Sequence, residues 1–473
     1  MTEFVDLDVV QTAGRLERFR ISAWAIEARE LMKLAGPLVI TQLAQMAILT
    51  TDVMMLGRLS TEALAGAALG NTVFYFSWLF GLGPTAAISP MIAHILGGSP
   101  NNRAGVRAVV RMGFWVTALF SVPLMLFLLF AKDVLLLLGQ QPNLAEAASQ
   151  FVRPLSFGLP FSLGFQVLRN YATALGRPKT SLWVVAVTIL FNAAADYALI
   201  FGHFGMPKLG LVGSGIASAS SYTFCFLAMT GVVFASRDLD KYRIFRRFFR
   251  PDWSKFAELF RLGMPIGVTM IFEAMLFNAS TLLMGTFGTA SVAAHQVALN
   301  VPSITFMVPL GIAMAATVRV GLAAGAGDLK GARLAGTTAL TISIAFMSVA
   351  AVILALFPHH IAALYFSTNA AKNAEVLALT AVFLKVAAAF QIADGIQVTA
   401  ALSLRGLKDA RMPMWIAAGS YWLAGFPVCI GLGLGLGWKG LGVWIGLAFA
   451  LIVAAILMCW RFYFLSRESR QAG

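Results

Sequence analysis

Four acidic residues lie inside long apolar stretches of this sequence, where a charged side chain is costly. Glu273 stands in the middle of an apolar run at 259–285, and Asp52, Asp196 and Asp394 lie in other such runs. A carboxylate at the centre of a membrane helix costs about 3 kcal/mol on insertion scales, so it usually faces a bundle interior or a wet cavity. An excess of buried acid over base suits a site that receives cations or protons. The simpler alternative is that these acids only cap helices or form hydrogen bonds within the bundle.

Polar neighbours accompany the acids in each half of the chain. Asn192 and Asp196 are four residues apart, so they share one face of a helix. With Asp52 facing them, they could supply oxygen ligands for a small hard cation. Burial also disfavours a charged carboxyl group, which makes protonation near neutral pH available. In the second half, the candidate polar neighbours of Glu273 and Asp394 are Asn278, Gln296, Gln391 and Gln397.

The composition identifies the class of protein that carries these acids. Of 473 residues, 59% are hydrophobic and 12% are charged, and the mean hydropathy is +0.81. A water-soluble domain could not cover so much apolar surface, and the repeated apolar runs indicate a polytopic membrane protein. The net charge of +14 comes from basic residues between these runs, a pattern that reflects membrane topology. We therefore expect the lipid bilayer as a partner and no nucleic acid.

The apolar runs fall into two groups of six, so we predict an all-α protein with about twelve membrane spans. The first group lies near 31–57, 63–95, 108–132, 148–174, 180–202 and 211–235. The second group lies near 259–286, 290–324, 332–357, 374–404, 411–436 and 440–465. Loops on alternate sides differ strongly in their content of Lys and Arg, which places the basic loops and both termini in the cytoplasm.

The same pattern divides the chain into five segments. They are a cytoplasmic tail at 1–29, a first lobe at 30–236, a basic cytoplasmic linker at 237–257, a second lobe at 258–466 and a tail at 467–473. The linker mixes bases with aromatics, as segments that bind single-stranded nucleic acid also do. Beside a membrane, this composition is more typical of a segment that lies on anionic lipid or simply joins two bundles.

The two halves of the chain repeat each other at a constant shift. Pro37 aligns with Pro265, and Glu273 aligns with Gln45. Because each half has six helices, both halves enter the membrane from the same side, and the repeat is parallel about an axis along the membrane normal. This symmetry predicts two bundles around a central cleft, with alternating access by rocking of one bundle against the other.

Motifs of enzymes and of ATP-driven pumps are absent from the sequence. No GxxxxGK[ST] loop, HExxH, GxSxG or paired-cysteine pattern occurs, so we expect neither an enzyme nor a cofactor. A flippase for a lipid-linked oligosaccharide could share this architecture, but its phosphates would require a basic cleft. An intramembrane aspartyl enzyme would require its acids to meet as one pair, whereas these acids are divided between two repeated lobes.

Four stretches of the sequence carry a more specific signal. They are TTDVMMLG with Asp52, MPIGVTMIFEAMLF with Glu273, AAHQVALN at 293–300 and DGIQVTAALSLRGLKD at 394–409. Together they resemble the multidrug and toxic compound extrusion transporters, and within that family the NorM-like branch. The resemblance covers about residues 30–465. It implies a two-lobed secondary antiporter that exports amphipathic, often cationic, organic compounds in exchange for Na⁺ or H⁺.

The resemblance also implies roles for residues of the second lobe. Glu273 and Asp394 match the acids that the NorM-like branch uses for cation coupling, and we expect Gln296 and Asn278 to assist them. Phe390 stands where relatives in that branch carry a tyrosine, so one hydroxyl ligand is missing.

The first lobe offers a second possible cation site. Asp52 matches the acid of this lobe, and Asn192 and Asp196 match the amide and carboxylate that join it in DinF-like relatives. Ser218 is a weaker match to a hydroxyl ligand there. Asp196 stands where the NorM-like branch often has an asparagine, which adds an acid. The sequence therefore leaves open which lobe couples and to which ion, and it predicts no metal other than Na⁺ at these sites.

Aromatic and methionine side chains would form the adaptable apolar wall of a site for many substrates. In the second lobe we expect substrate contacts from Phe272, Met275, Phe306, Phe390 and Gln391. Most residues of these types serve only in helix packing, which is the simpler interpretation. We expect a monomer in the cell (inner) membrane.

Overall fold

The computed structural model describes residues 6–365 and 374–467, and within these ranges the chain forms helices and no strand. The first half contains α1 (Asp6–Gly57), α2 (Thr61–Ala86), α3 (Ile88–Gly98), α4 (Arg103–Leu129), α5 (Ala131–Leu137), α6 (Pro142–Ser156), α7 (Leu159–Ala174), α8 (Pro178–Phe201), α9 (Gly210–Ala235) and α10 (Arg237–Asp240). The second half contains α11 (Trp253–Gly285), α12 (Thr289–Gly325), α13 (Leu329–Leu356), α14 (Pro358–Tyr365), α15 (Ala374–Gly406), α16 (Arg411–Ala418), α17 (Phe426–Ile430) and α18 (Lys439–Leu465). Two segments are π-helical: Gly419–Gly425 joins α16 to α17, and Gly431–Gly435 follows α17. Helices suit a bilayer because each satisfies its own backbone polar groups.

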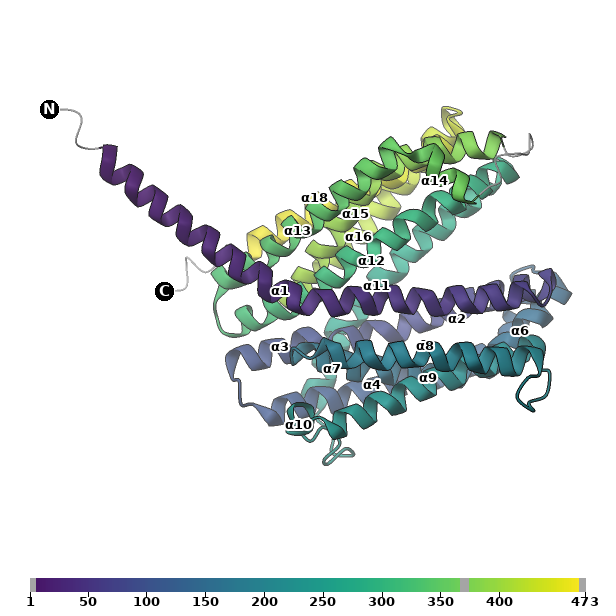
Figure 1. Cartoon of the computed structure of the whole chain (residues 1–473), viewed down its shortest axis with the longest axis horizontal. Helices are drawn as coiled ribbons and strands as arrows, with labels where there is room; N and C mark the ends of the chain where they lie inside the picture. The colour runs from purple at the N-terminus through teal and green to yellow at the C-terminus, as the bar shows by residue number, and fades with distance from the viewer. Residues whose placement is uncertain (1–5, 366–373, 468–473) are drawn as a thin grey trace.

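Eleven helices in the described part of the chain are long and apolar enough to cross a bilayer, against about twelve predicted spans. The difference lies at 148–174, where two shorter helices, α6 and α7, replace the expected continuous span. The break falls at Phe157 and Gly158, where a Cβ on the glycine would lie 2.9 Å from the Cα of Ala219. Glycine therefore lets the break pack closely against α9. Figure 1 places α6 and α7 towards opposite ends of their bundle, so together they run its length.

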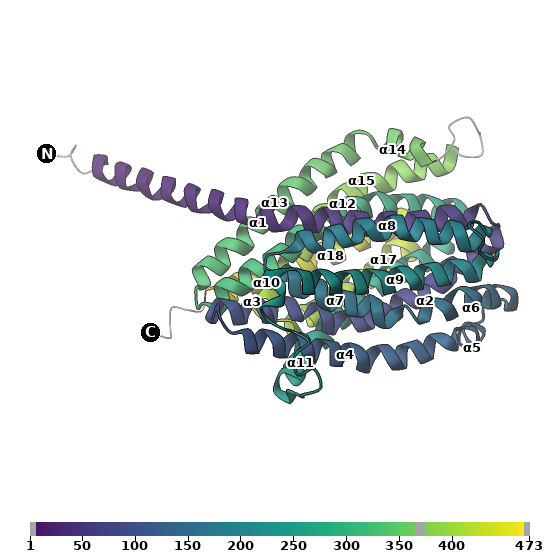
Figure 2. The same cartoon turned by 60° about the horizontal axis from the view of Figure 1, so that its bottom comes forward.

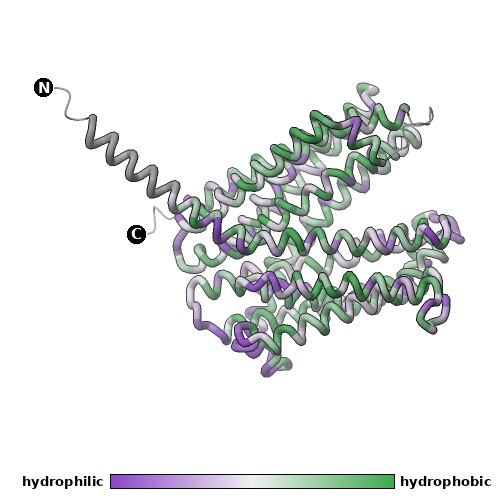
Figure 3. Tube along the Cα trace, viewed as in Figure 1, coloured by the Kyte–Doolittle hydropathy of each residue, from purple (hydrophilic) through white to green (hydrophobic). Residues whose placement is uncertain are grey.

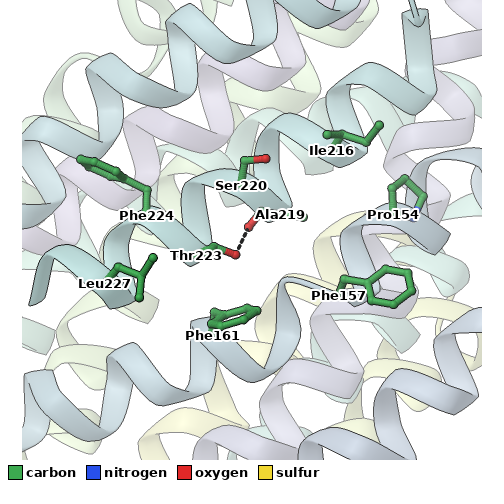
Figure 4. Close-up of a pocket in the computed structure, with 9 residues that line it drawn as sticks. All are labelled: Pro154, Phe157, Phe161, Ile216, Ala219, Ser220, Thr223, Phe224 and Leu227. Carbon is green, nitrogen blue, oxygen red and sulfur yellow. Dashed lines mark hydrogen bonds between the residues drawn. The ribbon is translucent and has the colours of Figure 1, made fainter. Parts of the chain in front are cut away.

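An apolar groove of about 560 Å³ lies where this break meets α9 (Figure 4). Its walls include the rings of Phe157, Phe161 and Phe224. The hydroxyl of Thr223 in the groove donates to the carbonyl of Ala219 at 2.9 Å, so it is satisfied within its own helix. None of the four intramembrane acids lines the groove, which is therefore separate from the candidate sites described below.

Helices α1–α9 form one lobe and α11–α18 form the other, which confirms the predicted architecture of two bundles (Figure 1). The lobes meet at the end of the molecule where both chain ends lie, and they diverge towards the other end. Figure 3 shows hydrophobic residues along the helices and hydrophilic residues gathered mainly in the connecting segments, as lipid-facing bundles require. That the joined end faces the cytoplasm stays a prediction from the loop charges.

The ends and the linker differ in detail from the predicted segments. Helix α1 begins at Asp6 and extends beyond both bundles (Figure 2), so most of the predicted tail 1–29 continues the first membrane helix. Of the predicted C-terminal tail, residues 468–473 lie outside the described residues. The linker packs against the first lobe: Tyr171 Oη donates to the carbonyl of Leu239 at 2.6 Å. Further along, Trp115 and Arg111 donate to linker carbonyls at 3.2 Å and 3.1 Å.

Glycines bring the two lobes into backbone contact at the joined end. Helix α3 crosses α12 so closely that a Cβ on Gly97 would lie 2.0 Å from the carbonyl oxygen of Leu322. A Cβ on Gly325 would lie 2.1 Å from the carbonyl oxygen of His94. Small residues at helix crossings let backbones approach, which is how membrane helices associate without a hydrophobic driving force. These crossings therefore fix how tightly the lobes close at this end.

An ion pair also joins the lobes at this end. Arg319 on α12 donates to both carboxylate oxygens of Glu27 on α1, with Nε 2.8 Å from Oε1. This contact gives Arg319 a partner in the other lobe. A bidentate contact of arginine with carboxylate is among the stronger polar pairs. The pair therefore supports the same closure as the glycine crossings.

We expect Gly325→Ala to destabilise the closed end of the molecule. The added methyl group would overlap the His94 carbonyl, and overpacking of this kind costs about 1–3 kcal/mol. Thermal unfolding of the detergent-solubilised protein should show a lower midpoint than the wild type. The control is Gly231→Ala on α9, where a Cβ meets nothing within 4 Å. Equal midpoints for the two variants would contradict the proposed close approach.

Candidate functional site

Three helices of the first lobe bring the predicted first-lobe residues together. Asp52 comes from α1, Asn192 and Asp196 come from α8, and Ser218 comes from α9. Ser218 Oγ donates to Asp52 Oδ2 at 3.4 Å. Asn192 is 1% exposed and Asp196 is fully buried. The carboxyl groups of Asp52 and Asp196 lie close enough for their charges to interact.

Much of the hydrogen-bonding capacity of this cluster is unused. Within the described residues, Asp52 Oδ1, both side-chain polar atoms of Asn192 and both carboxyl oxygens of Asp196 make no hydrogen bond of good geometry, although these three side chains lie near enough to interact with one another. Buried polar groups in proteins are usually paired, so the gathering of five such polar atoms in one place needs a reason. Carboxylate, amide and hydroxyl oxygens are the ligands that hard monovalent and divalent cations accept, and two adjacent acids can also share a proton. No group of three or more His, Cys, Asp or Glu side chains with metal-ligand geometry occurs in the described ranges.

The cluster opens into a cavity of about 240 Å³ inside the first lobe. Asp52, Asn192 and Ser218 contribute to its wall. Its aromatic lining consists of Phe74, Tyr75, Trp78, Phe151, Phe165 and Tyr222, and its further polar lining includes Gln45, Asn71, Gln166, Thr188 and Ser221. From the sequence, we predict no substrate contact in this lobe. The aromatic stretch FYFSW at 74–78 is a possible signal of such a contact, but aromatic residues of this kind are equally typical of helix packing.

The acids of the second lobe form a different arrangement. Glu273 on α11 is half-buried and Asp394 on α15 is 6% exposed, and the two carboxyl groups lie within electrostatic range of each other. Asp394 Oδ1 has no hydrogen-bond partner among the described residues. The buried side chains of Arg405 and Tyr421 lie within electrostatic range of Glu273, and the sequence alone did not predict either neighbour. No ion pair shorter than 4 Å links Arg405 to either acid in the part of the chain described.

Two predicted polar neighbours of these acids, Asn278 and Gln296, are exposed. Asn278 is exposed, and its Nδ2 donates to the carbonyl of Ala274 in its own helix at 2.8 Å. Gln296 is exposed on α12. Neither amide is hydrogen-bonded to Glu273 or Asp394 among the described side chains. Participation of the two amides in cation binding stays a prediction.

The predicted substrate contacts of the second lobe divide into two groups. Phe272 and Phe306 are half-buried and Met275 is exposed, so a ligand could reach them. Phe390 and Gln391, in contrast, are buried in the packing of the lobe.

The contacts of these two residues explain their burial. The ring of Phe390 packs edge-on against Trp444, with ring centroids 5.6 Å apart. Gln391 accepts a hydrogen bond from Thr305 Oγ1 at 3.0 Å and donates to the carbonyl of Met347 at 3.4 Å. Their contact with a substrate therefore stays a prediction that would require the lobe to repack.

Comparison with known proteins identifies the family. The sequence profile of the MatE family matches residues 37–198 and 265–430. The chain belongs to the MatE family. The two matched segments begin at Pro37 and Pro265, the same pair of prolines that aligns the internal repeat. The MatE repeat and the two lobes of the structure therefore coincide.

Relatives of the chain within MatE cover nearly its whole length. It is 43% identical over 439 residues to a probable multidrug resistance protein NorM of Mesorhizobium japonicum, covering 93% of this chain and 94% of the relative. It is 42% identical over 447 residues to a protein of the same name from Rhizobium meliloti, covering 94% and 95%. In three dimensions it resembles the crystal structure of the eukaryotic MATE transporter AtDTX14, with a TM-score of 0.83, 22% identity and coverage of 95% and 99%. This MatE protein is accordingly a multi-pass transporter of the cell membrane and not an enzyme.

Proposed function

We propose that this MatE transporter is a multidrug exporter that moves amphipathic, often cationic, organic compounds out of the cell in exchange for Na⁺ or H⁺. The observation that carries the proposal is the buried cluster of Asp52, Asn192 and Asp196, which reaches a cavity through Asp52 and Asn192. The relatives named as multidrug resistance proteins support the choice of drugs as substrates.

Competition between cation and substrate gives the simplest mechanism. A ligand shifts a two-state equilibrium only by its different affinity for the two states. A proton or cation bound at Glu273 and Asp394, or at Asp52 and Asp196, removes negative charge from the protein interior, so a cationic substrate binds there less tightly. The lobes meet at one end and diverge at the other, which suits release of substrate at the open end (Figure 1).

The lining of the first-lobe cavity fits cationic, partly aromatic compounds. Tyr75, Trp78 and Tyr222 offer ring faces that attract cations, and Asp52 offers a carboxylate. Cavities that enclose drug-sized ligands usually measure about 300–1,000 Å³, so a space of about 240 Å³ would hold one part of such a molecule. The remainder of the substrate would lie between the lobes.

The charge balance argues against the two rival functions. Near each candidate site two acids stand beside one buried arginine: Asp52, Asp196 and Arg169 in the first lobe, and Glu273, Asp394 and Arg405 in the second. Arg111, the other buried arginine of the described residues, donates to a carbonyl of the linker. The phosphates of a lipid-linked oligosaccharide would require the opposite balance. An aspartyl enzyme is disfavoured because the chain belongs to a family of transporters.

Transport in reconstituted vesicles tests the proposal directly. A fluorescent cationic dye would be loaded, and gradients of Na⁺ and of pH would be imposed separately. We expect at least one gradient to drive dye movement well above the leak of protein-free vesicles. Dye movement under neither gradient would overturn the antiport mechanism.

A further inference from the structure

A cluster of arginines without anionic partners lies where the linker crosses α4. Arg107 of α4 lies within electrostatic range of four other arginines, which are Arg111, Arg243, Arg246 and Arg247. Within the described residues, none of the five forms an ion pair with a carboxylate. Arg107 is half-buried, and the three linker arginines are exposed. Like charges gathered in this way repel one another, so an anion bound here would stabilise the folded protein.

Hydrogen bonds hold the linker arginines in place on α4. Arg107 Nε donates to the carbonyl of Tyr242 at 3.1 Å, and Arg111 Nη1 donates to the carbonyl of Arg247 at 3.1 Å. Trp115 adds a third bond to a linker carbonyl at 3.2 Å. The three donors are spaced four residues apart, so they lie along one face of α4. The linker backbone is therefore fastened along this face, and its guanidinium groups are preorganised for a ligand.

Aromatic rings continue from this cluster onto the second lobe. Trp115 packs edge-on against Trp253, the first residue of α11, with ring centroids 6.3 Å apart. Farther along both helices, Phe120 of α4 stacks against Phe260 of α11 at 6.0 Å. Trp253 and Phe260 are two turns apart on one face of α11, and they are 65% and 39% exposed. An apolar track thus runs along the seam where α4 of the first lobe meets α11 of the second.

This combination of charge and aromatic surface fits the boundary of a bilayer. Basic residues beside a membrane span attract anionic phospholipids, and exposed aromatic rings next to them enter the headgroup region. Phe249, which is 84% exposed, stands between Arg247 and Arg250 in the chain. Figure 3 shows hydrophilic residues gathered around the linker at the joined end of the molecule. A single-stranded nucleic acid would also use bases and rings, but it could not follow the rings along a membrane span.

We propose that Arg107 and the linker arginines bind the phosphate of an anionic phospholipid whose acyl chains lie against Trp253 and Phe260. The planar guanidinium groups match phosphate oxygens and donate charged hydrogen bonds to them. Because α4 and α11 belong to different lobes, the bound lipid contacts both lobes and stabilises the closed joined end. This inference goes beyond the proposed function and does not depend on ion coupling.

Thermal unfolding in lipid-doped micelles provides the measurement. The purified protein in dodecyl maltoside would be titrated with dioleoylphosphatidylglycerol, and dioleoylphosphatidylcholine would be the zwitterionic reference with the same acyl chains. A ligand that binds only the folded protein raises its unfolding midpoint. We expect phosphatidylglycerol to raise the midpoint more than phosphatidylcholine does. High salt should reduce the difference, since salt screens exposed charges.

The combination of Arg246→Gln and Arg247→Gln is the decisive variant. Both side chains are exposed, and the carbonyl of residue 247 that accepts from Arg111 is retained. We expect half-saturation to require about 10-fold more phosphatidylglycerol, because two basic contacts with the anionic lipid are lost. Native mass spectrometry should also show fewer phosphatidylglycerol molecules retained by the variant than by the wild type.

The combination of Lys179→Gln and Lys330→Gln is the matched control. It lowers the net charge by the same amount at exposed positions of α8 and α13, and it should titrate as the wild type does. Equal responses to the two lipids, or an equal loss in the control variant, would show that no specific lipid site exists. If inorganic phosphate or a single-stranded RNA raises the midpoint and phosphatidylglycerol does not, the cluster binds a soluble anion and the lipid site is wrong.

Discussion

Replacing Glu273 by glutamine is expected to abolish ion-driven dye efflux while the protein still inserts and folds. Glu273 and Asp394 interact in the second lobe, and Asp394 Oδ1 has no hydrogen-bond partner in the described part of the chain. Glutamine keeps the size of the side chain but can neither release a proton nor offer a charge to a cation. Loss even of an outer partner of a metal ligand costs about 10–100-fold in affinity, and loss of a direct ligand should cost at least as much.

The measurement is dye efflux from vesicles under imposed Na⁺ and pH gradients, normalised to the amount of protein inserted. Asp394→Asn should give the same loss, because the two acids act on one another. Lys385→Gln on α15 is the control, since it changes the charge at an exposed position of the same helix. Efflux by Glu273→Gln at the wild-type rate would remove the second lobe from the coupling mechanism.

Replacing Asp52 by asparagine is expected to weaken binding of a cationic dye by about 10–100-fold. Asp52 is the acid that lines the first-lobe cavity and accepts a hydrogen bond from Ser218. A hydrogen bond to a charged group contributes about 1.5–3 kcal/mol, which corresponds to that range of affinity. Asp196→Asn should have a smaller effect on dye binding, because Asp196 is fully buried and does not line the cavity.

Equilibrium binding of rhodamine 6G to the purified protein provides the measurement. Ser220→Ala is the control, because Ser220 lies on the same helix as Ser218 but lines the separate groove shown in Figure 4. Repeating the titration at several Na⁺ concentrations and pH values distinguishes the contribution of the first-lobe acids to dye binding from that of the second-lobe acids. If Asp52→Asn binds the dye as the wild type does, the first-lobe cavity is not the substrate site.

The membrane class, the repeat and the four acids could all be predicted from the sequence because each depends on local composition. A run of apolar residues identifies a span wherever it lies, and an acid such as Glu273 is conspicuous in it because burial of a charge is costly. The alignment of Pro37 with Pro265 needed only a constant shift along the chain. The break between α6 and α7 was missed, although Gly158 and Pro160 within the run were available as signals.

The partners of the buried polar groups were decided by the tertiary structure alone. The meeting of Asp52 with Ser218 joins helices far apart in the chain, and so does the contact of Arg169 with Gln45. In a soluble helix the apolar stripe shows which face is buried. In a membrane both the lipid-facing and the protein-facing sides are apolar, so the sequence carries little information about which side points inward. The sequence therefore determined which polar residues are costly to bury in a membrane. Only the packing of the two lobes decided which of these residues are in contact.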